Sequence, residues 1–208
     1  MRNRAETEIV LQWIRHGKTK SNIEHRYLGK TEEPLSKEGK QALEKQMKAG
    51  MYQGCDVVFV SPMKRCIETA ELLYPDRNRI VISEWEEMDF GAFEGKNYQE
   101  LQKDPRYQQW IDSNGTLPFP EGESREQFLM RCKSGWDRMV KILRETDAKQ
   151  VAIVVHGGTI MAVLSTLHGG EYFDYQVTNG DGYTCTAKFV GEQLNLIEVT
   201  KGFPLAEG

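Results

Sequence analysis

Several side chains that can bind phosphate or move protons stand directly after, or a few residues behind, apolar runs typical of buried strands. They are Arg15, His16, Arg65, Glu86, Glu87, Asp89, His156 and Gly157. Because ligand sites of open α/β sheets lie at the carboxyl ends of the strands, we expect these groups to meet at one edge. Arginine binds a phosphoryl group through two parallel hydrogen bonds. We expect helices to start at Gly17 and at Gly157-Gly158, where free N–H groups would add to this binding. The pattern therefore indicates a phosphate pocket.

Histidines placed among arginines suit nucleophilic chemistry. Guanidinium charges should lower the pKa of a nearby imidazole, because protonation would add a like charge. The unprotonated ring could then accept a phosphoryl group, and a neighbouring carboxylic acid could protonate the departing oxygen. Spacing alone leaves Glu86, Glu87 and Asp89 open for that acid. Each group also has a plainer interpretation, since single histidines, helical arginines and acidic runs are usually structural or solvated.

Two other kinds of site are disfavoured by the same residues. Gly17-Lys18-Thr19 has the end of a P-loop pattern, but that motif needs a glycine where this chain has Gln12. Two histidines and a carboxylate could be metal ligands, but two arginines in the same cluster would repel a cation. We therefore expect neither a nucleotide loop nor a metal or other cofactor.

Composition is that of an ordinary water-soluble globular protein. The chain has 208 residues, 39% hydrophobic and 28% charged, with 27 basic against 31 acidic side chains and a formal net charge of -4. This balance disfavours a nucleic-acid partner, and no apolar run approaches the roughly 20 residues needed to cross a membrane. We find no secretory h-region at the N-terminus. The four cysteines are widely spaced without a Cys-x-x-Cys pair, which favours a reducing cytoplasm.

Apolar runs bounded by turn residues alternate with helical patterns, which predicts an α/β fold with a largely parallel sheet. The predicted strands are Ile9–Ile14, Val57–Val60, Ile80–Ser83 and Val151–Val155. Two further strands, Tyr183–Val190 and Leu194–Val199, should form a terminal antiparallel hairpin around Gly191-Glu192-Gln193.

Three helix starts carry capping signals. Ser36 can cap a helix that runs to about Gly50, and Ser61-Pro62 predicts a helix directly after the second strand. Ser124 and Gln127 form a capping box before the longest helix. A core stripe at helical spacing follows the box: Phe128, Cys132, Trp136, Met139 and Leu143.

Residues 92 to 123 are rich in aromatic side chains and proline without clean periodicity. We expect a short helix around Tyr98–Lys103 and an otherwise irregular excursion. Long excursions of this kind are often lids or substrate-specificity segments, although a surface loop with ordinary packing would look similar. The whole chain, residues 1–208, is predicted to form a single domain that includes this excursion.

Five blocks of the sequence resemble the histidine phosphatase superfamily, in its phosphoglycerate mutase-like branch. They are "IRHGKTKSN", "SPMKRCIETA", "EEMDFGAFEG", "FPEGES" and "VVHGGTI". The blocks come in the order of that family and cover most of residues 9 to 167. The resemblance implies a three-layer α/β/α fold with a mostly parallel central sheet.

The resemblance also implies roles for individual residues. His16 is similar to the nucleophile that forms a phosphohistidine, and Glu87 stands where the family places its proton donor, ahead of Glu86 and Asp89. The remaining phosphate pocket would consist of Arg15, Asn22, Arg65, His156 and Gly157. Phe93 replaces the commoner tryptophan, and Glu33 stands where an aspartate usually precedes Pro-Leu.

The activity that the resemblance implies is hydrolysis of a small-molecule phosphate ester, similar to the α-ribazole-5′-phosphate phosphatases and broad-specificity members. Glycolytic mutases of the family resemble longer chains with an extra basic segment, whereas the stretch after Gly95 is aromatic and acidic to neutral. Two alternatives remain at this point: mutase-type phosphoryl transfer, and a module that binds phosphorylated ligands or proteins without turnover. The sequence makes no prediction of the oligomeric state.

Overall fold

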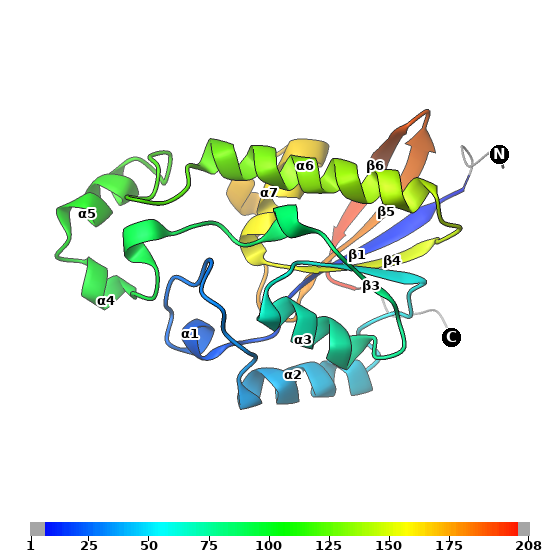
Figure 1. The fold of residues 1–208 in the computed structure, drawn as a ribbon, viewed down its shortest axis with the longest axis horizontal. Coiled ribbons are helices and arrows are strands. Elements are labelled where there is room, and N and C mark those ends of the chain that lie inside the picture. Colours follow the sequence, from blue (N-terminus) through cyan, green and yellow to red (C-terminus); the bar gives the residue numbers. More distant parts are fainter. Residues whose placement is uncertain (1–6, 204–208) are drawn as a thin grey trace.

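Six strands form one mixed sheet in the order β3-β2-β4-β1-β5-β6 in the computed structural model, which describes residues 7–203 (Figure 1). The strands are β1 (Ile9–Arg15), β2 (Val57–Val60), β3 (Arg79–Val81), β4 (Gln150–Val155), β5 (Gly182–Val190) and β6 (Gln193–Lys201). Strands β1 to β4 are mutually parallel, β5 is antiparallel to β1, and β6 is antiparallel to β5. The predicted mostly parallel sheet with a terminal hairpin is therefore confirmed; the predicted domain of residues 1–208 extends beyond the described residues at both ends.

The third strand is shorter than predicted. It was expected over Ile80–Ser83, but β3 ends at Val81. The N–H of Ile82 still bonds to the carbonyl of Val60 at 2.9 Å, and the chain then tightens into the 3₁₀ turn η1 (Ser83–Trp85). This turn sends the acidic segment that follows it back toward the centre of the sheet edge.

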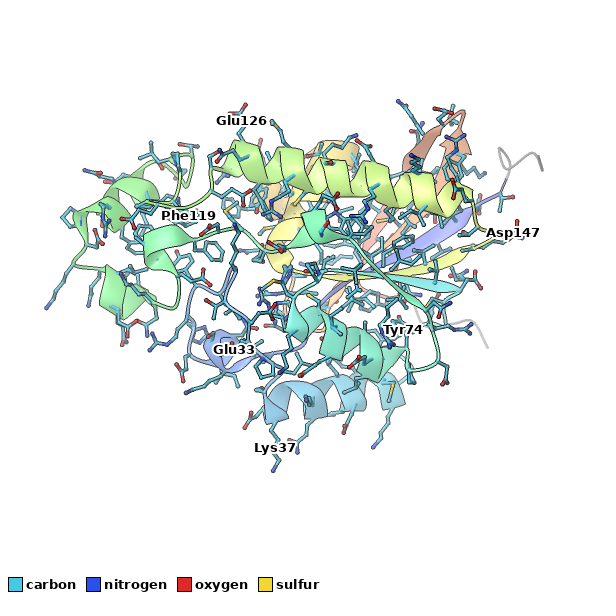
Figure 2. The ribbon with its side chains drawn as sticks, viewed as in Figure 1. Glu33, Lys37, Tyr74, Phe119, Glu126 and Asp147 are labelled. Carbon is cyan, nitrogen blue, oxygen red and sulfur yellow. The ribbon has the colours of Figure 1, made fainter. Side chains whose placement is uncertain are left out.

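Helices cover both faces of the sheet (Figure 1). One layer holds α2 (Lys37–Lys48) and α3 (Lys64–Leu73), and the other holds α6 (Arg125–Arg144) and α7 (Gly157–His168). Alternate residues of β1 point to opposite faces, so Leu11 and Trp13 join one hydrophobic cluster and Ile14 joins the other. The result is the predicted three-layer α/β/α arrangement, with charged side chains such as Lys37 and Glu126 on the outside (Figure 2).

Two of the three predicted helix caps are confirmed. Ser36 Oγ accepts the N–H of Gly39 at 2.9 Å, and the Ser124 side chain exchanges hydrogen bonds with Gln127 in a capping box. The predicted helix start at Ser61-Pro62 is wrong, because α3 begins at Lys64 and the Ser61 hydroxyl bonds to a histidine ring instead. The stripe from Phe128 to Leu143 is fully buried, as expected for core.

The excursion over residues 92 to 123 is more helical than predicted. It begins within the 3₁₀ turn η2 (Gly91–Phe93) and contains α4 (Tyr98–Leu101) and α5 (Pro105–Asp112), at the end of the molecule that also carries α1 (Lys20–Ile23) (Figure 1). The missed helix α5 begins at a proline capped by Asp104, whose side chain accepts the N–H of Arg106 at 3.0 Å. One more 3₁₀ turn, η3 (Tyr172–Tyr175), follows α7.

Within residues 7–203, no helix combines the length and the apolar character that a membrane span requires.

Gly135 on α6 provides a test of how tightly the acidic segment is packed. A Cβ atom at this position would lie 2.5 Å from Nε1 of Trp85, which is fully buried and donates to the Cys132 carbonyl at 3.2 Å. We expect Gly135→Ala to lower the free energy of unfolding by about 1–3 kcal/mol, because Trp85 must move out of a filled core. The helix preference of alanine, about 1 kcal/mol over glycine, offsets part of this loss.

Urea denaturation of Gly135→Ala and of Ser134→Ala would check this expectation. Ser134 is the exposed neighbour on the same helix, so its alanine variant should be as stable as the wild type or slightly more stable. Equal stabilities of the two variants would contradict the packing argument.

Candidate active site

The structure brings the predicted site residues together at one edge of the sheet. Arg15 and His16 lie at the end of β1, His156 follows β4, and Arg65 lies in the first turn of α3. The two imidazole rings are 5.2 Å apart between centroids, in an edge-to-face arrangement. Four of these groups are almost completely removed from solvent: His16 (3% exposed), Arg65 (0%), Glu87 (8%) and His156 (0%).

A hydrogen bond to the backbone orients the ring of His16. Its Nδ1 lies 2.7 Å from the Gly17 carbonyl oxygen, which can only accept, so Nδ1 carries the proton and Nε2 keeps its lone pair. The N–H of Gly17 donates in turn to Oγ1 of Thr69 at 3.0 Å. The expectation that Gly17 starts a helix is wrong, because α1 begins at Lys20 with Thr19 as its cap.

Burial keeps both imidazoles uncharged. Burial is the largest cause that lowers the pKa of His16 well below its ordinary value, and the charges of Arg65 and Arg15 lower it further. The pKa of His156 is lowered for the same reasons, again mainly by burial. The predicted direction for a histidine among arginines is therefore correct, but desolvation rather than like charge dominates.

Two guanidinium groups, that of the buried Arg65 and that of the partly buried Arg15, have donors without a partner among the described residues. Arg65 donates to the carbonyls of Thr31 (3.0 Å) and Gly29 (2.7 Å), and Arg15 Nη1 donates to Val177 (2.7 Å). The Nε atom of each arginine is buried without a hydrogen-bond partner among the described residues. Because an unpaired buried donor costs about 1–3 kcal/mol, these two atoms indicate that an anion belongs between the arginines.

The loop that holds Arg65 is itself fixed by a carboxylate. Glu94, next to η2, accepts the N–H groups of Gly29 (2.8 Å) and Thr31 (3.1 Å) through Oε1. The carbonyls of the same two residues then face the guanidinium of Arg65. The "FEG" end of the acidic block therefore sets the geometry of an arginine far away in the chain.

The ring of His156 is oriented by Ser61. Its Nε2 lies 2.8 Å from Ser61 Oγ, and the same hydroxyl oxygen accepts the N–H of Met63 at 3.4 Å. The nearby Cys66 thiol is unsuited to act as a nucleophile, because burial raises its pKa to about 12. Ser61 thus contributes to the site rather than to the start of α3.

Glu87 carries the properties of a proton donor. Burial raises the pKa of its carboxyl group, against the opposing effects of the Met88 N–H, Arg65 and Arg15. Its oxygens lie 3.0 Å from the Met88 nitrogen and 3.4 Å from the Gly158 nitrogen at the start of α7. A Cβ atom at Gly158 would occupy the space of Oε1 of Glu87, so a side chain there would displace the carboxyl group.

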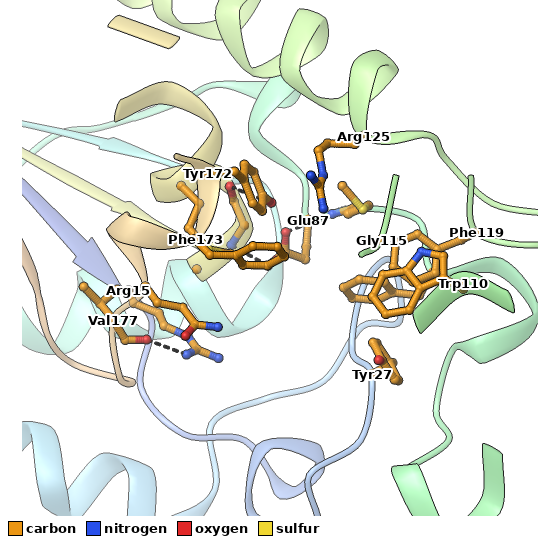
Figure 3. Close-up of a pocket in the computed structure, with 16 residues that line it drawn as sticks. Arg15, Tyr27, Glu87, Trp110, Gly115, Phe119, Arg125, Tyr172, Phe173 and Val177 are labelled. Atoms are coloured by element: carbon orange, nitrogen blue, oxygen red, sulfur yellow. Dashed lines mark hydrogen bonds between the residues drawn. The ribbon is translucent and has the colours of Figure 1, made fainter. Parts of the chain in front are cut away.

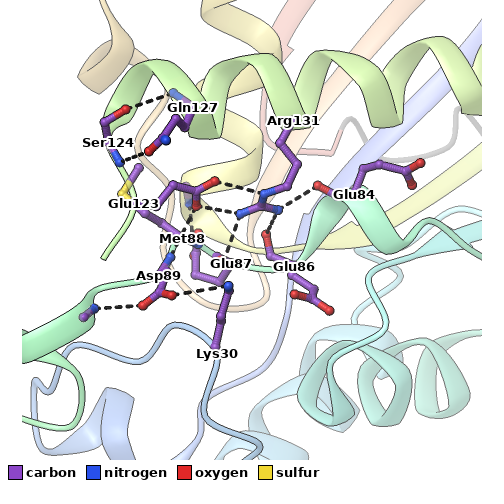
Figure 4. Close-up of polar contacts among 12 residues, drawn as sticks. Lys30, Glu84, Glu86, Glu87, Met88, Asp89, Glu123, Ser124, Gln127 and Arg131 are labelled. Carbon is purple, nitrogen blue, oxygen red and sulfur yellow. Dashed lines mark hydrogen bonds and ion pairs between the residues drawn. The ribbon is translucent and has the colours of Figure 1, made fainter. Parts of the chain in front are cut away.

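The two competing acids are either paired with other groups or directed away from Glu87. Asp89 lies 3.3 Å from Nζ of Lys30 and accepts the N–H of Gly91 at 2.9 Å. The carboxylate of Glu86 points away from Glu87 in Figure 4. Geometry therefore favours Glu87 among the three carboxylates.

Arg131 on α6 holds the segment that carries Glu87 (Figure 4). Its guanidinium donates to the main-chain oxygens of Glu84 (2.8 Å), Glu86 (2.9 Å) and Glu87 (3.4 Å). A pair with Glu123 at 2.7 Å fixes the guanidinium in turn. No sequence pattern predicted Arg131, although Glu123 lies within the "FPEGES" block.

Asn22 is also oriented by a residue that the sequence did not predict. Its Oδ1 accepts the N–H of Thr19 (3.2 Å) and Nδ2 of Asn179 (3.1 Å), which leaves the Asn22 amino group free to donate. Asn179 also donates to the His16 carbonyl at 3.0 Å. The turn before β5 therefore links the predicted polar residue to the strand end.

A cavity of about 390 Å³ adjoins the cluster (Figure 3). It shares Arg15, Glu87, Gly157 and Gly158 with the cluster, and its other walls are mainly aromatic. Among residues 7–203 no three His, Cys, Asp or Glu side chains stand in a metal-binding arrangement. The arrangement can therefore bind a dianion at the arginines and a larger group beside Glu87.

Known proteins resemble this chain in sequence and in fold. The family described as the histidine phosphatase superfamily (branch 1) matches residues 11–193. The chain is 29% identical over 160 residues to "Uncharacterized phosphatase PhoE" of Bacillus subtilis (strain 168), covering 76% of this chain and 77% of that protein. It is 29% identical over 162 residues to "Adenosylcobalamin/alpha-ribazole phosphatase" of Escherichia coli (strain K12), covering 75% and 77%. The alpha-ribazole phosphatase from Shigella flexneri has the same fold, with a TM-score of 0.76, 23% identity and coverage of 93% and 96%.

Imidazole charge states can be measured directly. At pH 6.5, where an ordinary histidine is half protonated, we expect His16 and His156 to remain neutral, with His16 protonated on Nδ1. As the pH falls below that value, both histidines become protonated in the unfolded chain but not in the folded protein. Both therefore lower the free energy of unfolding in acid. Nitrogen-15 NMR of the imidazoles, assigned with His16→Gln and His156→Gln, would check this. Half-protonated rings at pH 6.5 would refute it.

Proposed function

Since this chain belongs to the histidine phosphatase superfamily, we propose that it is a metal-independent phosphatase that hydrolyses small-molecule phosphate monoesters through a phosphohistidine at His16. Family membership supports phosphatase or mutase activity in general. The nucleophile, the proton donor and the choice of water as acceptor are the parts that we add.

The observation that carries the proposal is the environment of His16. Its Nδ1–H donates to Gly17, so the lone pair of Nε2 is available, and burial keeps the ring unprotonated. Beside it lie the guanidinium groups of Arg15 and Arg65, whose Nε atoms are buried and unpaired among the described residues. A phosphoryl group placed between these arginines would meet an uncharged nucleophile.

In the first half of the proposed reaction, Nε2 of His16 attacks phosphorus and the bond between phosphorus and the ester oxygen breaks. Protonated Glu87 gives its proton to the departing alcohol oxygen, so the alcohol leaves neutral. Arg15, Arg65, Asn22, His156 and the N–H of Gly157 hold the phosphoryl oxygens as negative charge builds on them. Because Glu87 lines both the phosphate cluster and the cavity, it is placed where the ester oxygen would lie.

In the second half, a water molecule replaces the alcohol. Glu87, now a carboxylate, takes a proton from this water as its oxygen attacks phosphorus. The bond between Nε2 and phosphorus breaks, inorganic phosphate leaves, and both His16 and Glu87 return to their starting states. Proton and phosphoryl transfers balance without a metal ion or a cofactor.

Water is favoured over a second substrate hydroxyl by the lining of the cavity. Mutases must hold an anionic group at each end of their substrate, but the aromatic walls supply only Arg125 at the far end. Residues 92–123 would serve as the specificity segment of a single domain. All four cysteines are unpaired, which supports a reducing cytoplasm as the proposed location.

Substitution of His16 tests the proposed nucleophile. In EDTA, the wild type should release phosphate from a panel containing p-nitrophenyl phosphate, 3-phosphoglycerate, sugar phosphates, nucleotides and α-ribazole-5′-phosphate. His16→Ala should retain its fold and lose about a thousandfold or more in kcat, because no other group can accept the phosphoryl group. His168→Ala, an exposed histidine at the end of α7, is the matched control and should keep full activity.

Acid-labile phosphate trapped on wild type but not on His16→Ala would identify the intermediate. Near-normal turnover by His16→Ala would remove the proposed nucleophile, and strong inhibition by EDTA would favour a metal site. Interconversion of phosphoglycerates in place of phosphate release would favour a mutase.

Substitution of Glu87 distinguishes the proposed proton donor from the groups that only bind phosphate. Glu87→Gln should lower kcat/KM for alkyl phosphates by about 10²–10⁴-fold, because their alcohols need a proton to leave. The value of kcat/KM reports only the steps up to the phosphoenzyme. For p-nitrophenyl phosphate it should therefore fall far less, because the nitrophenolate can leave without a proton. Arg131→Met should also lower kcat/KM more for alkyl phosphates than for p-nitrophenyl phosphate, but by smaller factors, because it loosens the segment that carries Glu87.

Arg138→Met is the control for Arg131→Met. Arg138 lies on the same helix and pairs with Glu84 at 3.0 Å, but at the surface. Arg138→Met should leave kcat/KM unchanged for both kinds of ester. Equal losses on both esters in Glu87→Gln would assign the acid to another group.

A further inference from the structure

We propose that the cavity beside Glu87 selects phosphate monoesters whose alcohol carries an aromatic ring. This inference rests on the proposed phosphatase activity and names its substrate class. It assigns specificity to two aromatic walls: Tyr27, Phe90, Trp110 and Phe119 on one side, and Tyr172 and Phe173 on the other (Figure 3).

The cavity is where the alcohol of the ester must lie. It meets the phosphate cluster at Arg15, Glu87 and the start of α7. A phosphoryl group between the arginines would therefore point its ester oxygen toward Glu87 and its alcohol into the cavity. The volume of about 390 Å³ exceeds the roughly 150 Å³ of a cavity that holds one benzene molecule.

The first wall is a preformed group of rings from three segments. Tyr27 and Phe90 are 5.1 Å apart between centroids, Phe90 and Phe119 are 5.0 Å apart, and Trp110 and Phe119 are 4.8 Å apart. These contacts hold the rings in place before a ligand arrives. A rigid aromatic surface favours a flat partner, because stacking and edge contacts then cost little ordering.

The opposite wall is held by Arg125 at the start of α6. Its guanidinium lies 5.1 Å from the centroid of Tyr172 and 5.2 Å from that of Phe173, and donates to the Asn114 carbonyl at 3.0 Å. Gly115, with φ of +66°, lets the chain turn close to this guanidinium. Phe173 remains 50% exposed at the cavity, so a ligand ring would cover apolar surface that is now wet.

Charge argues against a second phosphate or a dicarboxylate. The charged groups that line the cavity are Arg15, Glu87 and Arg125. Arg15 serves the reacting phosphate, and Arg125 already donates to a carbonyl and covers two rings. Recognition of the alcohol must therefore come mainly from apolar and aromatic contact.

The test compares esters whose alcohols have similar leaving ability: 2-phenylethyl, 2-cyclohexylethyl and ethyl phosphate. We expect kcat/KM for the phenylethyl ester to exceed that of ethyl phosphate by about tenfold or more, from the apolar area buried. It should exceed that of the cyclohexylethyl ester by about threefold, because only the aromatic ring gains from ring–ring geometry. Equal values for the phenylethyl ester and either comparison ester would overturn the proposal.

Alanine variants of the two aromatic walls show which residues cause the preference for the phenylethyl ester. Trp110→Ala and Phe173→Ala should each reduce the ratio of phenylethyl to ethyl kcat/KM about fivefold, through KM, because each removes one ring face. Because the two variants lie on opposite walls, one still tests the preference if the other fails to fold. Tyr98→Ala is the matched control, since Tyr98 is 62% exposed in the same excursion and does not line the cavity. An unchanged ratio in both wall variants would also overturn the proposal.

A binding measurement separates this inference from the proposed activity. 2-Phenylethylphosphonate and ethylphosphonate cannot be hydrolysed, and their affinities can be measured by calorimetry even if no ester is turned over. Tighter binding of the phenylethyl compound, lost in Trp110→Ala, would support the aromatic site although the phosphatase proposal had failed. Equal binding of the two phosphonates would overturn the aromatic site whatever the turnover.

Discussion

The fully buried guanidinium of Arg65 is the charge on which the rest of the site depends. A charge taken out of water is costly unless partners surround it, and two carbonyls of the loop at Gly29 and Thr31 supply part of that compensation. Its Nε remains unpaired, as does that of Arg15, so the site is electrostatically incomplete without an anion. The carboxylate of Glu94 keeps the loop carbonyls in position. Anion binding is thus built into the buried edge of the sheet rather than added on its surface.

The same burial shifts the pKa values of His16 and Glu87, the two groups that react in the proposed mechanism. Desolvation disfavours any charged form, so it lowers the pKa of His16 and raises the pKa of Glu87. Both shifts favour the uncharged form, which is the state that a nucleophilic imidazole and a proton-donating carboxyl group require. One physical cause therefore prepares two opposite chemical roles. The arginines modify this outcome: they strengthen the shift at His16 and oppose it at Glu87.

Precision at the site comes from residues that touch backbone rather than ligand. Thr69 holds the loop after His16, Asn179 orients Asn22, and Arg131 holds three successive carbonyls around Glu87. The aromatic walls of the cavity add a second layer of preorganisation, since their rings contact one another before any ligand is present. In the proposed reaction, such a site would hold the phosphoryl group in a fixed position and leave the far end of the ester to apolar contact.

The sequence by itself determined the order of the strands along the chain, the long helices α2 and α6, the capping box at Ser124, and which side chains stand at the strand ends. These features follow from local periodicity and from residue types a few positions apart. Only the tertiary structure decided that Ser61 orients His156, that Gly17 starts no helix, and that Asn179 and Arg131 belong to the site. Each of these depends on a hydrogen bond to a group distant in the chain, or on a start residue set by packing. Such contacts leave no periodic pattern, because a donor that reaches a distant carbonyl needs only to be in the right place, not in a particular sequence neighbourhood.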